Sequence, residues 1–124
     1  MAGFVKLEQM DVWKRGCRLA VKIYKITNAG GLERDWGLRD QIRRAAVAIP
    51  SNIAEGYERG TPAEFRRFAQ IAKGSCGELR TQIYLAQALG YISKSDSSDI
   101  IKECMEISAM LQGLIRQLTK PTKP

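Results

Sequence analysis

The chain has 124 residues, enough for one domain that buries a hydrophobic core without a metal ion or a disulfide. Hydrophobic residues make up 44% of it, which argues against intrinsic disorder, and three cysteines without any histidine argue against a zinc site. The net charge of +7 favours contact with a polyanion, although many proteins carry such a charge without one.

The first predicted element is a helix from about residue 8 to residue 27, after a flexible N-terminus over residues 1–7. Small and apolar side chains recur there at steps of three and four, the spacing of one helix face. They are Val12, Gly16, Leu19, Ala20, Ile23 and Thr27, flanked by Trp13 and Tyr24. The run Asn28-Ala29-Gly30-Gly31 ends this helix, because glycine tolerates the left-handed conformation that closes helices.

The second predicted helix begins after Asp35, a good N-cap residue, and ends at Gly56 and Gly60. Its interior contains Pro50, and an interior proline removes a backbone donor at a cost of about 3 kcal/mol. Two alternatives follow: a kinked helix that continues to about Tyr57, or a helix that stops before the proline and restarts. We favour one kinked helix, because the apolar spacing continues across the proline. The residues of this spacing are Leu38, Ile42, Ala45, Ala46, Ile49, Ile53 and Tyr57.

The third predicted helix begins at Thr61-Pro62-Ala63-Glu64, a capping box with proline at the first helical position, and ends before Gly90. Its core face consists of Phe65, Phe68, Ala72, Cys76, Leu79, Ile83 and Ala86. The fourth helix begins near the serine and aspartate residues at positions 95–99. Its core face consists of Ile101, Cys104, Ser108, Leu111, Ile115 and Leu118.

These four helices predict an all-α fold, because sustained period-two alternation and hairpin turns are missing. Short connections between amphipathic helices favour an antiparallel up-down four-helix bundle over residues 8–118. Pro121 and Pro124 end the last helix, which leaves a flexible tail at residues 119–124.

A basic stripe is predicted on the first helix. Lys14, Arg18, Lys22 and Lys25 fall within about 80° of arc, opposite the apolar face, and Arg15 lies beside them. Like charges at this spacing repel, so folding does not explain them. Two interpretations remain open: a ridge that contacts nucleic-acid phosphates, or an ordinary solvated face without aromatic residues for base stacking.

Polar residues of the second helix form another group. Gln41, Arg44, Asn52 and Glu55 lie on a helix that is otherwise largely apolar, and such groups need partners if they are buried. We expect a structural polar network, in which Asn52 or Ser51 also satisfies carbonyl groups freed by the proline. An active site is the less favoured alternative, since no nucleophile–base pair is evident.

Two features of the third helix concern packing. The run Ala72-Lys73-Gly74-Ser75-Cys76-Gly77 predicts a close helix crossing, because small residues let a neighbouring helix approach. A phosphate-binding loop is the less favoured alternative, since the run lacks the spacing of that motif. Ile71, Leu85 and Leu89 form a second apolar edge. This edge fits a contact with another subunit or a wide core, and polar residues on it weaken the subunit interpretation.

The three cysteines, Cys17, Cys76 and Cys104, fall at apolar positions and are expected to be small buried thiols of a reducing compartment. No apolar segment near the N-terminus resembles a signal peptide, and no uncharged run approaches the ~20 residues that cross a bilayer. We therefore expect a soluble, cytoplasmic protein that does not contact membranes and uses no metal or other cofactor.

The motif in the second helix, continued in the third, is recognisable. It reads Leu38-x-x-Gln41-x-x-Arg44-Ala45-Ala46-x-x-Ile49-Pro50-Ser51-Asn52-Ile53-Ala54-Glu55-Gly56, then Glu64-Phe65-x-x-Phe68-x-x-Ile71-Ala72-x-Gly74-Ser75-x-x-Glu78-Leu79. This sequence resembles the four-helix-bundle proteins encoded in 23S rRNA intervening sequences, also called the S23 ribosomal protein family. Ala48 and Cys76 depart from residues often found in the family, but both are small.

The resemblance implies a ring-like homo-oligomer, expected to be a pentamer. It extends distantly to the accessory variability protein of diversity-generating retroelements, a basic barrel thought to engage nucleic acid and a reverse transcriptase. Gln41, Arg44, Asn52 and Glu55 carry over as family hallmarks without a catalytic role.

Together these observations favour a non-enzymatic, homo-oligomeric accessory protein that binds RNA or DNA through its basic stripe. The alternative is a structural or protein-interaction scaffold without nucleic-acid binding. An enzyme with Glu55 and Arg44 in a cleft is the third and least favoured hypothesis.

Overall fold

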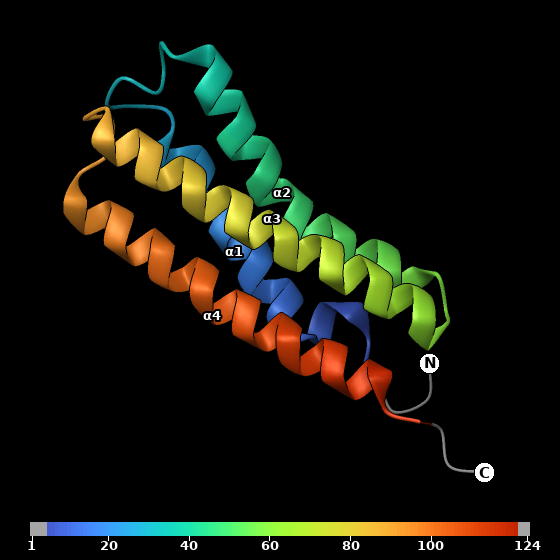
Figure 1. Cartoon of the computed structure of the whole chain (residues 1–124). Coiled ribbons are helices and arrows are strands. Elements are labelled where there is room, and N and C mark those ends of the chain that lie inside the picture. Colours follow the sequence, from blue (N-terminus) through green and yellow to red (C-terminus); the bar gives the residue numbers. More distant parts are fainter. Residues whose placement is uncertain (1–4, 122–124) are drawn as a thin grey trace.

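The computed structural model describes residues 5–121, which form four α-helices after one short 3-10 helix and contain no β-strand (Figure 1). The elements are η1 (Leu7–Gln9), α1 (Asp11–Ile26), α2 (Trp36–Glu58), α3 (Pro62–Ala88) and α4 (Lys94–Thr119). The predicted all-α fold is confirmed. None of these helices is long and apolar enough to cross a membrane. Residues 1–4 and 122–124, parts of the two predicted flexible ends, lie outside the described residues.

The helices pack in a closed order around one core. Each packs against its neighbour in the chain, and α1 also packs against α4. The first predicted apolar face is confirmed in full, since all six of its residues are buried, including the polar Thr27. Thr27 satisfies its hydroxyl by donating to the Ile23 carbonyl at 2.7 Å. The largest fully buried side chains are Phe65, Ile23, Leu32, Ile42, Ile49, Ile53, Leu79, Ile83, Ile100, Ile107 and Leu111.

The second helix, α2, is continuous through Pro50, so it does not stop before the proline. Asp35 caps it as predicted, because its carboxylate accepts a hydrogen bond from the Leu38 amide at 3.2 Å. The proline is buried against α1 at Gly16, where an added Cβ would lie 3.4 Å from the proline ring. The small residue at Gly16 therefore lets α1 approach this part of α2.

The predicted end of α2 near Tyr57 is confirmed, since the helix ends at Glu58, but Gly56 does not terminate it. Gly56 is buried inside the helix against α3, and a Cβ there would lie 2.8 Å from Phe68 Cβ and 3.2 Å from the Phe65 backbone. The helix instead ends before Gly60, whose φ of 82° is in the left-handed region. Thr61 then caps α3 by accepting a hydrogen bond from the Glu64 amide at 3.2 Å. The sequence pattern identified both glycines but not their different roles.

Two connections meet at one end of the molecule. Gly31 lies against Tyr91, such that an added Cβ would be 2.7 Å from the tyrosine ring. The Tyr91 hydroxyl donates to Asp35 Oδ2 at 3.1 Å, while the other carboxylate oxygen caps α2. One aspartate thus joins the start of α2 to the turn between α3 and α4.

Candidate functional site

The α1 stripe, defined as Lys14, Arg18, Lys22 and Lys25, is on the surface of α1. Arg18 and Lys25 are exposed, and Lys14 and Lys22 are half-buried. Among residues 5–121, none of the four forms an ion pair or donates a side-chain hydrogen bond. Their charges are therefore not neutralised by a carboxylate of the described chain.

Arg15, the fifth cation predicted for this surface, has a different role. Its Nη2 donates to both carboxylate oxygens of Glu103, at 2.5 and 2.7 Å, and to Glu106 at 2.6 Å. The hydrogen bonds with Glu103 and then Glu106 raise the pKa of Arg15, and the bond with Arg15 lowers the pKa of Glu106. Arg15 links α1 to α4 and does not belong to the α1 stripe.

The polar network predicted for α2 is not formed. No hydrogen bond or ion pair between residues 5 and 121 joins any two of Gln41, Arg44, Asn52 and Glu55. Gln41 and Arg44 are exposed, and neither side chain has a hydrogen-bond or ion-pair partner in the described part of the chain. Asn52 donates to the carbonyl of Ala48 in its own helix at 2.8 Å, so it does not satisfy the carbonyl freed by the proline.

These residues instead form an outer polar ridge beside α3. By helical geometry Gln41, Arg44, Asn52 and Glu55 share about 80° of arc. Glu55 pairs with Arg59 at 3.0 Å, and the Arg59 guanidinium lies 4.8 Å from the centre of the Phe68 ring on α3. The ridge therefore borders α3, and its polar groups face solvent.

The predicted apolar edge of α3 is exposed. Ile71, Leu85 and Leu89 are 42%, 52% and 58% exposed. By helical geometry this edge is on the α2 side of α3. Gln82 lies with it, is 8% exposed, and has a buried Oε1 that accepts no hydrogen bond from residues 5–121. We call the α2 ridge and this edge together the α2–α3 face. Two features that were predicted separately are thus neighbours.

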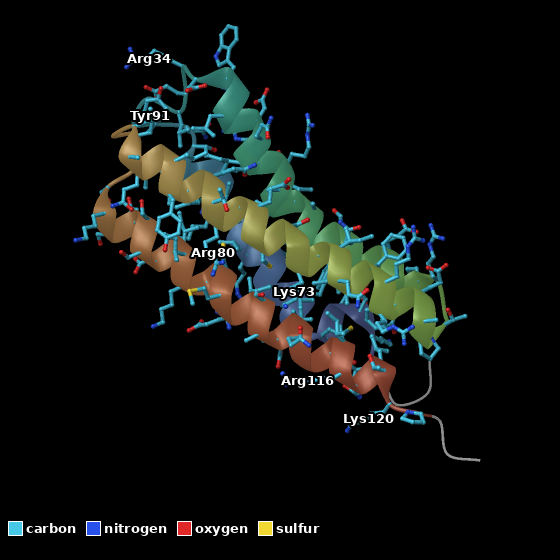
Figure 2. All side chains as sticks on the ribbon, viewed as in Figure 1. Arg34, Lys73, Arg80, Tyr91, Arg116 and Lys120 are labelled. Carbon is cyan, nitrogen blue, oxygen red and sulfur yellow. The ribbon has the colours of Figure 1, made fainter. Side chains whose placement is uncertain are left out.

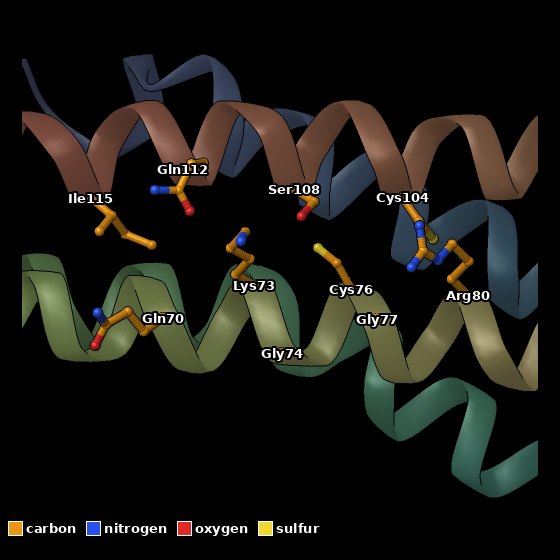
Figure 3. A pocket seen from close by; sticks show the side chains of 10 residues that line it. All are labelled: Gln70, Lys73, Gly74, Cys76, Gly77, Arg80, Cys104, Ser108, Gln112 and Ile115. Atoms are coloured by element: carbon orange, nitrogen blue, oxygen red, sulfur yellow. The ribbon is translucent and has the colours of Figure 1, made fainter.

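The prediction of a close crossing at Gly74 and Gly77 is wrong. A Cβ added at either position would have nothing within 4 Å. Both glycines line an open groove between α3 and α4 with a volume of about 520 Å³ (Figure 3). We call this cavity the α3–α4 groove, and its other lining residues are Gln70, Lys73, Cys76, Arg80, Cys104, Ser108, Gln112 and Ile115. The α2–α3 contact at Gly56, not this run, is the close one.

Two cations in this groove were missed by the sequence analysis. Lys73 and Arg80 extend from α3 between the ribbons of α3 and α4 (Figure 2). They are seven residues apart, which places them on the same side of the helix about 10 Å from one another along its axis. The sequence signal that could have identified these two cations is their spacing of two helical turns, on either side of a run that contains glycine.

The cysteines differ in exposure. Cys76 and Cys104 are buried, as predicted, whereas Cys17 is only partly buried. Burial raises the pKa of Cys76 to about 11 and that of Cys104 to about 12, so both thiols stay protonated at neutral pH. In residues 5–121, no group of three or more His, Cys, Asp or Glu residues could hold a metal ion.

Comparison with known proteins adds two similarities. The profile of the 23S rRNA-intervening sequence protein family matches residues 8–113. The fold is similar to the crystal structure of a protein of unknown function from the S23 ribosomal protein family of Bacteroides thetaiotaomicron VPI-5482. The TM-score is 0.77 at 24% identity, over 85% of this chain and 98% of that chain. No curated protein matches the sequence.

Proposed function

Because the chain belongs to the family of 23S rRNA-intervening sequence proteins, as its motif indicated, we propose that it is a non-enzymatic, homo-oligomeric accessory protein that binds RNA or DNA. The α1 stripe supplies the phosphate contacts. The observation that carries this proposal is a row of four cations at helical spacing with no carboxylate partner among the described residues.

Contacts of this kind are electrostatic and largely independent of base sequence. Folding gains nothing from like charges at steps of three and four, which weaken a helix by a few tenths of a kcal/mol per pair. Arg15 supports the same interpretation by contrast, because a cation that serves the fold is held by two carboxylates. The α1 stripe has no such partner and remains available for a polyanion.

The α2–α3 face is proposed as the contact between subunits of a ring, expected to be a pentamer. Its exposed apolar edge and the unpartnered Gln82 amide are groups that a second subunit could cover and satisfy. Five copies of a modest basic surface in one ring gain effective concentration on a long nucleic acid. A basic surface that binds weakly in one subunit is therefore sufficient for binding by the whole ring.

This assembly uses a bundle whose consecutive helices run up and down, with α2 kinked at Pro50. Connections of three to nine residues between helices that pack side by side support this topology. The buried proline inside α2 supports the kink, because its ring leaves a carbonyl group without an intrahelical donor.

The proposal includes the cellular compartment in which the protein acts. Three free cysteines agree with a cytoplasmic location, where thiols stay reduced.

A nucleic-acid enzyme such as a reverse transcriptase is the kind of partner protein that an RNA- or DNA-bound accessory ring would serve.

The test reverses the α1 stripe to glutamate at all four positions and measures binding of a single-stranded RNA across a salt series. For the natural chain, four phosphate contacts predict a log–log slope of about −3 per protomer. The reversal is expected to abolish binding while light scattering still reports the natural oligomer, close to five times the chain mass of 13.9 kDa.

The matched control reverses Arg34, Arg66, Arg116 and Lys120, which are equally without ion-pair partners in residues 5–121 and lie outside the α1 stripe. This control lowers the net charge by the same amount and is expected to retain binding. Equal loss in both variants would show that only total charge matters. Unchanged binding after reversal of the α1 stripe would contradict the proposal, and no binding by the natural chain would leave the scaffold function.

A further inference from the structure

The α3–α4 groove is a cavity that the proposed function does not use. Lys73, Cys76 and Arg80 project into it from α3, and Cys104, Ser108, Gln112 and Ile115 line it from α4 (Figure 3). Its volume of about 520 Å³ is within the range of small-ligand sites, about 300–1,000 Å³.

The charge of the groove is one-sided. Lys73 and Arg80 have no ion-pair partner among residues 5–121, and no carboxylate is among the lining residues. The two thiols add no negative charge, because burial keeps their pKa values at about 11 for Cys76 and about 12 for Cys104. At neutral pH the groove therefore carries two uncompensated positive charges.

Part of the groove wall is bare backbone. Gly74 and Gly77 lie inside α3, where each glycine costs about 1 kcal/mol relative to alanine. The fold does not require them, because an added Cβ would have nothing within 4 Å at either position. What they provide is room between the two cations.

The remaining lining groups suit a polar ligand with an apolar part. Gln70, Ser108 and Gln112 offer neutral donors and acceptors, and Ile115 provides an apolar surface at one end of the groove (Figure 3). Lysine recognises phosphate as a point charge, and arginine can donate two parallel hydrogen bonds to it.

We propose that the α3–α4 groove binds the phosphate group of a nucleotide, with Lys73 and Arg80 on either side of the phosphate. The shared chemistry is a phosphate ester, which a free mononucleotide or a nucleic-acid strand can supply. The site is separate from the α1 stripe, and it can exist whether or not the stripe binds nucleic acid.

The test follows the backbone amide signals of Gly74 and Gly77 by NMR while adenosine 5′-monophosphate, a ten-residue oligoadenylate RNA or inorganic phosphate is added to the full chain. Either nucleotide probe is expected to shift both amides and to leave Gly113 on α4 unchanged. Shifts with the mononucleotide identify a free nucleotide as the source, and shifts with the oligonucleotide alone identify a strand.

The double variant Lys73→Gln/Arg80→Gln is expected to weaken this binding at least tenfold. The control Arg116→Gln, an exposed cation of α4 outside the groove, is expected to bind like the natural chain. Should the double variant fail to fold, Gly74→Leu places a bulky side chain at a lining position where an added Cβ has nothing within 4 Å, and it is expected to lose binding too. Because reversal of the α1 stripe leaves the groove intact, it is expected to abolish RNA retention and preserve the mononucleotide shifts.

The proposal is overturned if none of the three probes shifts the two glycine amides, as would occur if a second subunit covers the groove. It is also overturned if the double variant binds with natural affinity. Shifts with inorganic phosphate but with neither nucleotide would equally exclude a nucleotide ligand.

Discussion

The two sides of α3 use glycine in opposite ways. Toward α2, Gly56 brings the helices so close that an added Cβ would meet the Phe65 backbone at 3.2 Å, and the Tyr57 and Phe65 rings pack edge to face there. Toward α4, Gly74 and Gly77 border open space. A helical glycine therefore does not by itself indicate close packing. Each glycine lowers helix stability, but toward α2 it allows a close helix contact, and toward α4 it leaves open space.

The largest expected effect is on the close side. Gly56→Ala should lower the free energy of unfolding by about 2–3 kcal/mol, because the added methyl overpacks against a backbone atom that cannot rotate away. Urea unfolding followed by circular dichroism measures the change. Gly37→Ala is the control within α2, since its Cβ would meet only Asp35 Oδ1, at 4.0 Å, and it should not destabilise the chain. A neutral Gly56→Ala would remove the contrast between the two sides.

The second effect tests whether the base of the groove is dry. The folded pKa values of Cys76 and Cys104, about 11 and about 12, exceed the ordinary value of 9.0, so their contribution to stability is complete below pH 9. It is lost as the pH rises through the folded values. Between pH 8 and about pH 9.7 the natural chain should lose on the order of 2 kcal/mol more than a Cys76→Ala/Cys104→Ala variant. Equal losses in urea titrations at both pH values would mean that water reaches the thiols.

The smallest expected effect is on the open side. Gly74→Ala and Gly77→Ala should each raise the free energy of unfolding by about 1 kcal/mol, because alanine is the better helix former and nothing opposes its methyl group. Gly113→Ala, at an exposed position of α4 with nothing within 4 Å, should gain about as much and so calibrates the measurement. Destabilisation at Gly74 or Gly77 alone would indicate that the groove closes over its base in solution.

The helices and most of their buried faces were predictable, because apolar residues at steps of three and four determine which side of a helix is buried. In α4 the predicted face was displaced, since Ile101 and Ser108 are only partly buried and Ile100 and Ile107 are buried instead. Helix starts were predictable where a cap is local, as at Asp35 and Thr61. The side to which Gly56 or Gly74 points was not, since it depends on how one helix is rotated against another. For the same reason Arg15 could not be assigned to Glu103, which is 88 positions away in the chain.

The candidate sites differ in the same way, because features of one helix were predictable and features shared by two helices were not. The spacing of the α1 stripe is a property of one helix and could be given from the sequence, and the described structure leaves those cations unpaired. The α3–α4 groove combines two helices from different parts of the chain, so its cations were not recognised. The polar residues of α2 were assigned to a buried network because their exposure depends on how α3 lies beside them.

The double use of the Asp35 carboxylate has a practical consequence for protein engineering. An insertion between α1 and α2, or between α3 and α4, would disturb the contact of this carboxylate with Tyr91, and an insertion next to Asp35 would also disturb the cap of α2. No hydrogen bond within residues 5–121 ties the turn at Gly60 to another connection, and a Cβ at Gly60 would meet nothing within 4 Å. Affinity tags, fluorescent reporters or new chain termini made by circular permutation therefore belong at Gly60, at the other end of α2.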